Sequence, residues 1–209
     1  MNTVKSKPAD SLPKILVLYG SPHQSGATAR LLGSFLQPLE GLCEVELLRA
    51  FDQPAAPCTG CLSCEHTPGC SQPDFVGLEQ KVRTARVLVI ATPVYFLSYP
   101  APLKALIDRF QCYWAMRVSH GIRPVYAPRK TGVLLACAGS DDVRCQDMLL
   151  AQTRMAYSVV DTDISHAVFW MGIDRENTGE QQALERARLA GEAVARQLDK
   201  EKGGTPFAE

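Results

Sequence analysis

The sequence predicts an α/β fold: a doubly wound sheet of five parallel strands between two layers of helices, as a three-layer α/β/α sandwich. Three strand-length runs lack polar alternation, at residues 15–19, 87–90 and 132–137. Such runs are typical of parallel strands that helices cover on both faces. The strand candidates also alternate with helix candidates, and each parallel pair of strands needs a crossover of this kind.

Length and composition indicate one domain. The chain has 209 residues, of which 46% are hydrophobic, enough for a well-buried core. Its 22 basic residues balance 22 acidic ones, so no nucleic-acid partner is expected. We expect a flexible N-terminal segment at 1–13, a single domain at 14–201 and a tail at 202–209. No apolar run reaches the roughly 18 residues of a membrane span, which favours a soluble, cytoplasmic protein without membrane contacts.

In the first half of the chain, periodicity and turn residues predict the elements. Apolar residues at helical spacing predict a helix over 27–39, which Pro38 ends. Residues 43–48 alternate before they become apolar, which indicates an edge strand. Residues 52–73 show no periodicity, and a loop of this length inside a domain is usually functional or disordered. Asp74 is expected to cap a helix that runs to Thr84.

The second half continues the alternation of strands and helices. A helix that begins near Pro102 is expected to pack one face on the sheet, through Leu103, Leu106, Ile107, Phe110 and Trp114. Lys104 and Asp108 form an i, i+4 pair on this helix. A further helix is expected over 143–157, and the last strand lies somewhere within 159–170. Thr178 with Gln181 forms a capping-box signature for a closing helix that reaches Leu198.

The loop after the first strand, at residues 20–28, has the composition of a phosphate cradle. Glycine lets the backbone approach a ligand, hydroxyl groups donate hydrogen bonds, and a helix N-terminus attracts an anion. Gly20 and Gly26 do not form the Gly-x-Gly-x-x-Gly of dinucleotide binders, and no nucleotide-triphosphate loop follows. The loops after Ala91 and Cys137 lie at the same edge of the predicted sheet, where ligands bind. The alternative is an ordinary strand-to-helix turn.

Four closely spaced cysteines within residues 57–73 form the sharpest local signal: Cys58, Cys61, Cys64 and Cys70. Thiolates hold iron-sulfur clusters, and a compact Cys-x-x-Cys-x-x-Cys run lets one bent loop direct three sulfurs to one centre. Zinc is a weaker alternative because its four-cysteine sites combine two separated pairs. A metal-free loop and a redox disulfide also stay open. The other cysteines lie in or beside predicted elements and are expected to be buried free thiols: Cys43, Cys112, Cys137 and Cys145.

With these motifs in view, the chain resembles the NADPH-dependent FMN reductase family and its relatives, the iron-sulfur flavoproteins, which have the flavodoxin-like fold. The resemblance covers residues 15–109 and rests on Gly20-Ser21-Pro22 with Gly26 and Thr28, Pro57-Cys58-Thr59-Gly60-Cys61, Pro93-Val94-Tyr95 and Leu103-Lys104-Ala105-Leu106-Ile107-Asp108-Arg109. The cysteine spacing is similar to the compact motif that holds a [4Fe-4S] cluster in iron-sulfur flavoproteins. Cluster-free relatives also keep several of these cysteines.

The resemblance implies an FMN site built from three loops. The residues around the phosphate would be Ser21, His23, Ser25, Gly26, Ala27 and Thr28. The residues along the isoalloxazine and the ribityl chain would be Pro93, Val94, Tyr95 and Phe96, and those at the polar edge of the ring would be Ala138, Gly139 and Ser140. Relatives often have Arg or Lys where this chain has His23, so N–H and hydroxyl donors would hold the phosphate. We name no catalytic side chain, because FMN itself carries the redox chemistry.

The expected function is that of an FMN-dependent oxidoreductase, which passes electrons from NAD(P)H to a quinone, a flavin or another small acceptor. One alternative is an electron carrier with FMN and a [4Fe-4S] cluster on the cysteine loop, and another is a flavin-free scaffold. No motif specifies a nicotinamide pocket, and a ferredoxin could replace NAD(P)H as the donor. The resemblance also implies a homodimer or homotetramer. Neither the acceptor nor the choice between NADH and NADPH follows from the sequence.

Overall fold

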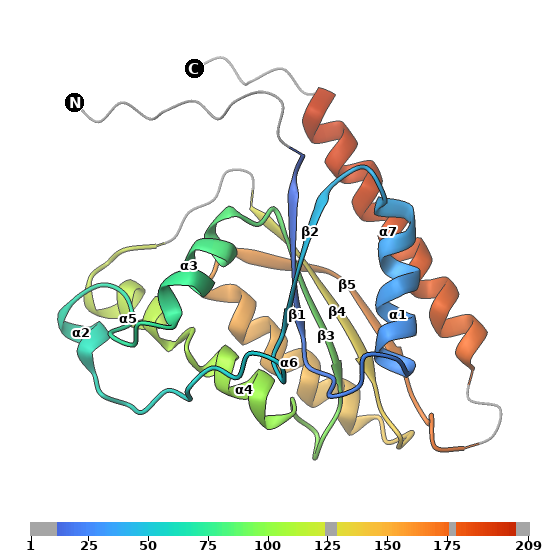
Figure 1. The fold of residues 1–209 in the computed structure, drawn as a ribbon, viewed down its shortest axis with the longest axis horizontal. Helices are drawn as coiled ribbons and strands as arrows, with labels where there is room; N and C mark the ends of the chain where they lie inside the picture. The colour runs from blue at the N-terminus through green and yellow to red at the C-terminus, as the bar shows by residue number, and fades with distance from the viewer. Residues whose placement is uncertain (1–11, 124–128, 176–178, 204–209) are drawn as a thin grey trace.

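A five-stranded sheet forms the centre of the structure, and each pair of neighbouring strands is parallel. The computed structural model describes residues 12–123, 129–175 and 179–203. The strand order is β2-β1-β3-β4-β5, so it reverses between β1 and β3 (Figure 1). The bounds are β1 Lys14–Tyr19, β2 Glu44–Arg49, β3 Val87–Pro93, β4 Lys130–Cys137 and β5 Thr162–Trp170. This topology confirms the predicted flavodoxin-like fold.

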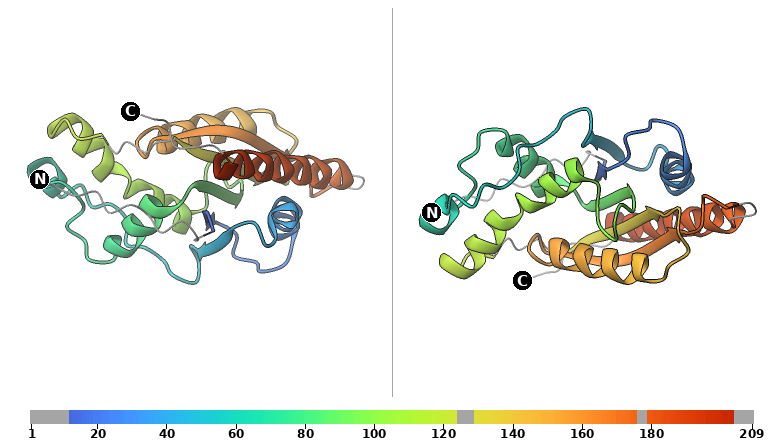
Figure 2. Two further views of the ribbon diagram at one scale, coloured as in Figure 1. Left: turned by 90° about the horizontal axis from the view of Figure 1, so that it is seen from above. Right: turned by 90° about the horizontal axis from the view of Figure 1, so that it is seen from below.

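Helices cover both faces of the sheet, which explains the apolar central strands (Figures 1 and 2). One face carries α1 (Ala27–Leu36), the 3-10 turn η1 (Gln37–Leu39) and α7 (Glu180–Gly203). The other carries α3 (Phe75–Thr84), α4 (Ala101–Asp108) and α6 (Arg144–Ser158). Two shorter helices, α2 (Ser63–His66) and α5 (Gln111–Ser119), pack together to one side of the sheet (Figure 1).

The two edge strands differ from the three central ones. The side chains of β1, β3 and β4 are buried at nearly every position, whereas β2 and β5 are partly exposed. The ambiguous segment at 159–170 resolves into β5 from Thr162 onward, and exposure on one face explains its polar residues. The predicted burial of four free cysteines is confirmed at Cys43, Cys112, Cys137 and Cys145.

The helix expected from Pro102 to Trp114 was a wrong prediction, because the chain divides it into α4 and α5. The N–H groups of Arg109 and Phe110 donate to carbonyls three residues back, at 3.3 and 2.9 Å. Bonds of this kind tighten the chain into a 3-10 turn between the two helices. As a result α5 leaves the sheet, and the Trp114 side chain is 43% exposed instead of buried.

The side chain of Asp74 does not cap α3, contrary to expectation. Its carboxylate is instead occupied by Arg109, in a network described below. The predicted pair of Lys104 and Asp108 is present, with Nζ and Oδ1 2.5 Å apart. The expected capping residue Thr178 lies outside the described residues, as do residues 1–11 and 204–209 of the terminal segments. Residues 202 and 203 of the expected tail belong to α7.

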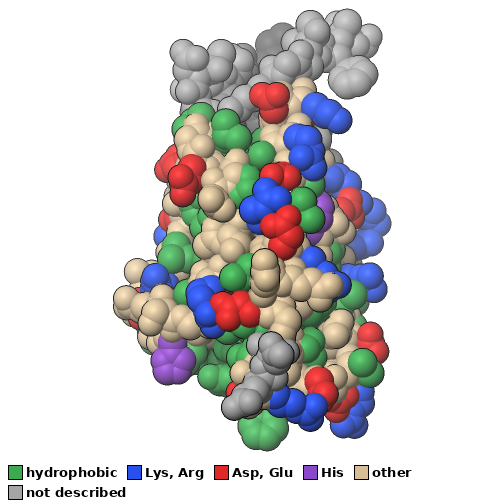
Figure 3. Space-filling model, turned by 90° about the vertical axis from the view of Figure 1, so that its right-hand side faces the viewer, with side chains coloured by type: hydrophobic (Ala, Val, Ile, Leu, Met, Phe, Trp, Pro, Cys, Tyr) green, Lys and Arg blue, Asp and Glu red, His purple; other side chains and the backbone are tan. Residues whose placement is uncertain are grey.

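The surface formed by α1 and α7 carries basic and acidic side chains that are interspersed (Figure 3). On α7, for example, Arg188 pairs with Glu185 at 2.7 Å. Within the described ranges, no helix combines the length and the apolar character needed to cross a membrane.

The contact between α1 and α7 depends on a glycine. A Cβ atom at Gly191 of α7 would lie 2.1 Å from the carbonyl oxygen of Phe35 in α1, far inside van der Waals contact. Phe35 is fully buried beneath α7 and has little room to move. Gly33 on α1 offers a contrast, because no heavy atom lies within 4 Å of a Cβ at that position.

We predict that Gly191→Ala lowers the free energy of unfolding by about 1–3 kcal/mol, because the methyl group would push the two helices apart. The matched variant Gly33→Ala adds the same group in open space on a helix, and should raise stability by about 0.5–1 kcal/mol. Urea denaturation followed by circular dichroism measures both changes. Two variants of equal stability would contradict this account of the helix contact.

Candidate functional site

Three loops meet at the carboxyl edge of the sheet, beside the reversal of strand order between β1 and β3 (Figure 1). The N–H group of Gly20 donates to the carbonyl of Ala91 at 2.8 Å, which joins the loop after β1 to β3. The N–H group of Val94, which follows the last β3 residue Pro93, donates to the carbonyl of Cys137 at 2.8 Å. The structure therefore brings together the loops that the sequence singled out, where doubly wound sheets bind ligands.

The loop after β1 leads into the N-terminus of α1, whose first N–H groups lack intrahelical partners. Gly26 is the N-cap residue, and its φ of 143° lies in a region that side chains rarely adopt. The hydroxyl of Tyr19 donates to the carbonyl of His23 at 2.8 Å, and the N–H of His23 donates to Oγ of Ser21 at 3.2 Å. These bonds hold the loop in place, while Ser25 stays exposed. The loop thus offers helix N–H groups and hydroxyl groups to an anion.

Two polar residues of α1 lie near this loop. Thr28 is buried, and its N–H group lies in the first turn of α1. Arg30 pairs with Glu180, and its guanidinium carbon lies 4.9 Å from the ring centroid of Trp170. Because Glu180 of α7 and Trp170 of β5 hold the Arg30 side chain, the donors that the loop offers to an anion are N–H and hydroxyl groups.

The loop after β3 is a tight turn with a strained backbone. Tyr95 and Ser98 exchange two backbone hydrogen bonds of 2.9 Å. Between them, Phe96 and Leu97 have φ values of 49° and 63°. Two successive positive φ angles are typical of a type I′ turn, which usually requires glycine or asparagine. The turn leaves Phe96 fully exposed and Tyr95 45% exposed. Strain of this kind clusters at ligand sites, and here it presents two aromatic rings.

Gln152 of α6, which sequence reasoning missed, supports this turn. Its Nε2 donates to the carbonyl of Leu97 at 3.1 Å, and the hydroxyl of Ser98 donates to its Oε1 at 2.8 Å. The hydroxyls of Tyr99 and Thr153 lie 2.5 Å apart in the buried layer below. The one signal in the sequence is the polar pair Gln152 and Thr153 on the side of α6 that faces the core.

The loop after β4 packs against the loop after β5, which the sequence did not single out. The N–H group of Ile173 donates to the carbonyl of Ala138 at 3.1 Å. A Cβ atom at Gly139 would lie 2.0 Å from Oδ2 of Asp174, so only glycine lets this carboxylate approach so closely. Ala138 is buried and Ser140 is exposed. Asp174 therefore joins the candidate site as a negative charge beside the predicted loop.

The four cysteines of the loop line one cavity between the loop and α5, with a volume of about 250 Å³. Arg109 and Trp114 also line this cavity. Left-handed backbone at Gly60, Leu62 and Gly69 makes the bends of the loop. In the part of the chain that the structure describes, no three Cys, His, Asp or Glu side chains converge closely enough to hold a single metal ion. The loop thus gathers thiols around one space without forming a single-ion cage.

Hydrogen bonds favour the charged form of Cys61. Its sulfur lies 3.5 Å from the hydroxyl oxygens of Ser63 and Ser71. Hydrogen bonding with Ser63 and then with Ser71 lowers the pKa of the Cys61 thiol to about 7, whereas burial raises the pKa of Cys64. A thiolate is the form that binds metals and reacts with oxidants. Among the cysteines of the loop, these contacts make Cys61 the one whose pKa is lowered.

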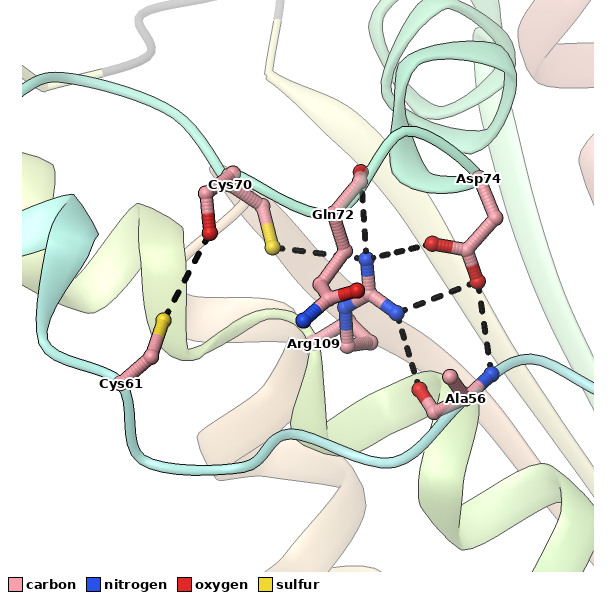
Figure 4. A network of polar contacts seen from close by, with 7 residues as sticks. Ala56, Cys61, Cys70, Gln72, Asp74 and Arg109 are labelled. Atoms are coloured by element: carbon pink, nitrogen blue, oxygen red, sulfur yellow. Dashed lines mark hydrogen bonds and ion pairs between the residues drawn. The ribbon is translucent and has the colours of Figure 1, made fainter.

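Arg109, at the junction of α4 and α5, ties the cysteine loop to the body of the domain (Figure 4). Its guanidinium donates to the carbonyl of Ala56 at 2.8 Å and to both carboxylate oxygens of Asp74 at 2.8 and 3.2 Å. It also reaches the sulfur of Cys70 at 3.4 Å and the carbonyl of Gln72 at 3.5 Å. The hydrogen bond from Arg109 holds the pKa of the Asp74 carboxyl below its usual value. Sequence reasoning placed Arg109 in a motif but did not foresee these contacts.

The sequence matches known proteins over much of its length. The model of the family described as NADPH-dependent FMN reductase matches residues 13–163, which is more than half of the chain. An iron-sulfur flavoprotein from Archaeoglobus fulgidus is 30% identical over 128 residues, a match that covers 60% of this chain and 55% of that protein. The chain spans about half the length of the first curated relatives it matches.

Solved structures share the fold. A NAD(P)H:quinone oxidoreductase from Methanothermobacter marburgensis aligns with a TM-score of 0.61 and 16% identity, over 88% of this chain and 100% of that one. An azoreductase from Bacillus anthracis aligns with a TM-score of 0.58 and 15% identity, over 90% of this chain and 100% of that one. Taken with the family match across residues 13–163, the five-stranded flavodoxin-like sheet shows that the chain belongs to the NADPH-dependent FMN reductase family.

Proposed function

We propose that the protein is an FMN-dependent oxidoreductase that passes electrons from NAD(P)H to a small acceptor such as a quinone or a flavin. The observation that carries this proposal is the meeting of three loops beside β1 and β3, where Gly26 opens the N-terminus of α1. Family membership supports FMN as the cofactor. The structural neighbours named as a quinone oxidoreductase and an azoreductase support a small acceptor.

The residues of these loops fit a flavin mononucleotide. The phosphate would be held by N–H groups in the first turn of α1 and by the hydroxyls of Ser21 and Ser25. These donors suit an anion even where no basic side chain lies beside it. Tyr95 and Phe96 offer exposed aromatic rings to a flat ring system, and the turn fixes the backbone that carries them. When bound, FMN supplies hydride and electron transfer, so no side chain of the protein has to act as acid or base. The chain's own task is to bind and orient.

A second candidate function is that of an electron carrier with a [4Fe-4S] cluster in addition to FMN. Four thiols line one cavity, and hydrogen bonds lower the pKa of the Cys61 thiol. This donor set suits an iron-sulfur cluster, which takes four cysteine ligands around a centre larger than a single ion. Curated relatives are named iron-sulfur flavoproteins, which supports the same reading. For this function a ferredoxin would serve as the electron partner.

We also propose that the protein works as a homodimer or homotetramer. A groove between α4, α5 and α6 includes Trp114 and Met155, which are 43% and 63% exposed and are candidates for such a contact. Multi-angle light scattering of the flavin-loaded protein would measure the subunit number.

The proposed activity predicts that protein purified without oxygen carries FMN and oxidises NADH or NADPH steadily when a quinone is supplied. The loss of nicotinamide absorbance measures turnover, and free FMN at the same concentration is the control. If the protein binds FMN but oxidises NADH or NADPH no faster than free FMN does, the reductase is contradicted and the electron carrier becomes the leading function. A colourless protein that fails to bind added FMN would contradict both functions.

We predict that Gly26→Ala weakens FMN binding about tenfold, because a side chain at its φ costs about 1–3 kcal/mol and would distort the first turn of α1. Gly41→Ala is the matched control: it also replaces a glycine with positive φ and open space for a Cβ, but it lies between η1 and β2. Quenching of flavin fluorescence on titration with the apoprotein measures both affinities. Equal affinities in the two variants would argue against a cradle at Gly26.

For the electron carrier, iron and acid-labile sulfide should each reach about four per chain in protein purified without oxygen. Cys64→Ser should lose this iron, because it removes one ligand from the cavity, whereas Cys145→Ser removes a buried thiol outside the loop and should retain it. Chemical iron analysis and the visible spectrum measure the cluster content of both variants. Iron at background in the wild-type protein would rule out the cluster and favour the reductase.

A further inference from the structure

We infer that Arg109 is a positioning residue for the cysteine loop: it clamps the two ends of the loop to the α4–α5 junction and presents an N–H group to the sulfur of Cys70. The clamp involves only residues of this chain. Its effect on a redox centre rests on the proposed second function, in which the loop holds a cluster.

The contacts of Arg109 fall at the two ends of the loop. Ala56 lies just before Cys58, and its carbonyl accepts at 2.8 Å. Cys70, Gln72 and Asp74 lie at the far end, and each also accepts from the guanidinium. One side chain thus closes the segment that contains the other three cysteines. Closing a loop removes chain entropy from the open state, so the clamp restricts where the sulfurs can go.

The burial of Arg109 shows that its charge depends on these contacts. Its side chain is 1% exposed, while that of its partner Asp74 is 44% exposed. A buried guanidinium is costly unless it is paired and hydrogen-bonded. The ring of Phe75 adds a contact, with its centroid 5.3 Å from the guanidinium carbon. Most of the compensation therefore comes from the loop, so the loop and Arg109 order each other.

Only arginine can make this set of bonds. Its planar fork carries five N–H donors in fixed directions, whereas a lysine ammonium offers three donors from a single point. The acceptors around Arg109 come from four residues on two stretches of chain. Its Nε–H is buried and has no partner among the described atoms, and Arg109 also lines the cysteine cavity.

The same helix links Arg109 to the candidate flavin site. A Cβ atom at Gly20, the first residue of the loop after β1, would lie 2.5 Å from Cδ2 of Leu103 in α4. Leu103 and Arg109 are six residues apart, which corresponds to about 9 Å along a helix. The cysteine loop is therefore held relative to the flavin loops by one short, packed helix.

A positive charge and an N–H donor beside a ligand sulfur also have an electronic effect. They stabilise the more negative, reduced form of a thiolate-bound redox centre, and so raise its reduction potential. Arg109 meets both conditions at Cys70. A residue that served packing alone would show no dependence on charge, so partial restoration of the potential by lysine, but not by methionine, separates the electronic role from a general structural one.

The test uses full-length, FMN-loaded protein with three variants: Arg109→Lys, Arg109→Met and the control Arg117→Met, which removes an exposed arginine from α5. In metal-free protein, hydrogen exchange across residues 56–74 should rise about tenfold in both Arg109 variants and stay unchanged in Arg117→Met. Alkylation of Cys70, followed by mass spectrometry, should accelerate in the same two variants. Unchanged exchange in β1, β3 and β4 shows that the domain remains folded.

In protein reconstituted with iron and sulfide under anaerobic conditions, the midpoint potential should fall in Arg109→Met. It should be partly restored in Arg109→Lys, which keeps the charge, and stay unchanged in Arg117→Met. Loss of iron from Arg109→Met alone would equally support the clamp. If the two Arg109 variants show the same exchange and alkylation rates as Arg117→Met, the clamp is overturned. If the midpoint potential is the same in the wild type and all three variants, the electronic role is overturned.

Failure of the proposed functions is visible separately in the wild-type protein. Wild-type protein without FMN contradicts the flavin function whatever Arg109 does. Wild-type protein with FMN but without iron contradicts the cluster, and the exchange measurement on metal-free protein then decides the clamp.

Discussion

Burial of β1, β3 and β4 on both faces is the constraint on which the rest of the structure depends. Their side chains lie between two layers of helices and their backbone groups are paired within the sheet, so polar chemistry is displaced to the strand ends. Because the strands are parallel, their carboxyl ends share one edge, and reversal of the strand order leaves room there between diverging crossovers. The topology of the fold therefore brings the three loops of the candidate site together, whatever side chains they carry.

Features that depend on local periodicity were predictable from the sequence. The apolar run at residues 15–19 is compatible with a doubly covered strand, and the glycines and hydroxyls that follow it mark the loop at the edge. The break between α4 and α5 was not predictable, because apolar spacing continues through Phe110 to Trp114. Asp74 gave the signal of a helix cap, yet its carboxylate is used by an arginine 35 residues away. In both cases the departure from the local pattern lies at Arg109, which makes long-range contacts.

The residues of the candidate site also fall into a predictable group and an unpredictable one. Its loops carry recognisable residues, whereas its supports come from polar side chains whose partners are distant in sequence. Gln152 braces a turn 55 residues away, and Asp174 lies against Gly139 from the end of the neighbouring strand. A polar residue within a helix or after a strand gives no local sign of which distant backbone group it will bond. The sequence therefore indicated which loops form the candidate site better than which contacts support those loops.

The turn at Phe96 and Leu97 has a consequence for the kinetics of ligand encounter. Its left-handed backbone is already held by Gln152 and by the paired residues Tyr95 and Ser98, so its conformational entropy is lost when the protein folds and not when a ligand arrives. A molecule that reaches this turn would meet a preformed backbone, so its rate of docking would be set by diffusion and orientation instead of by loop closure.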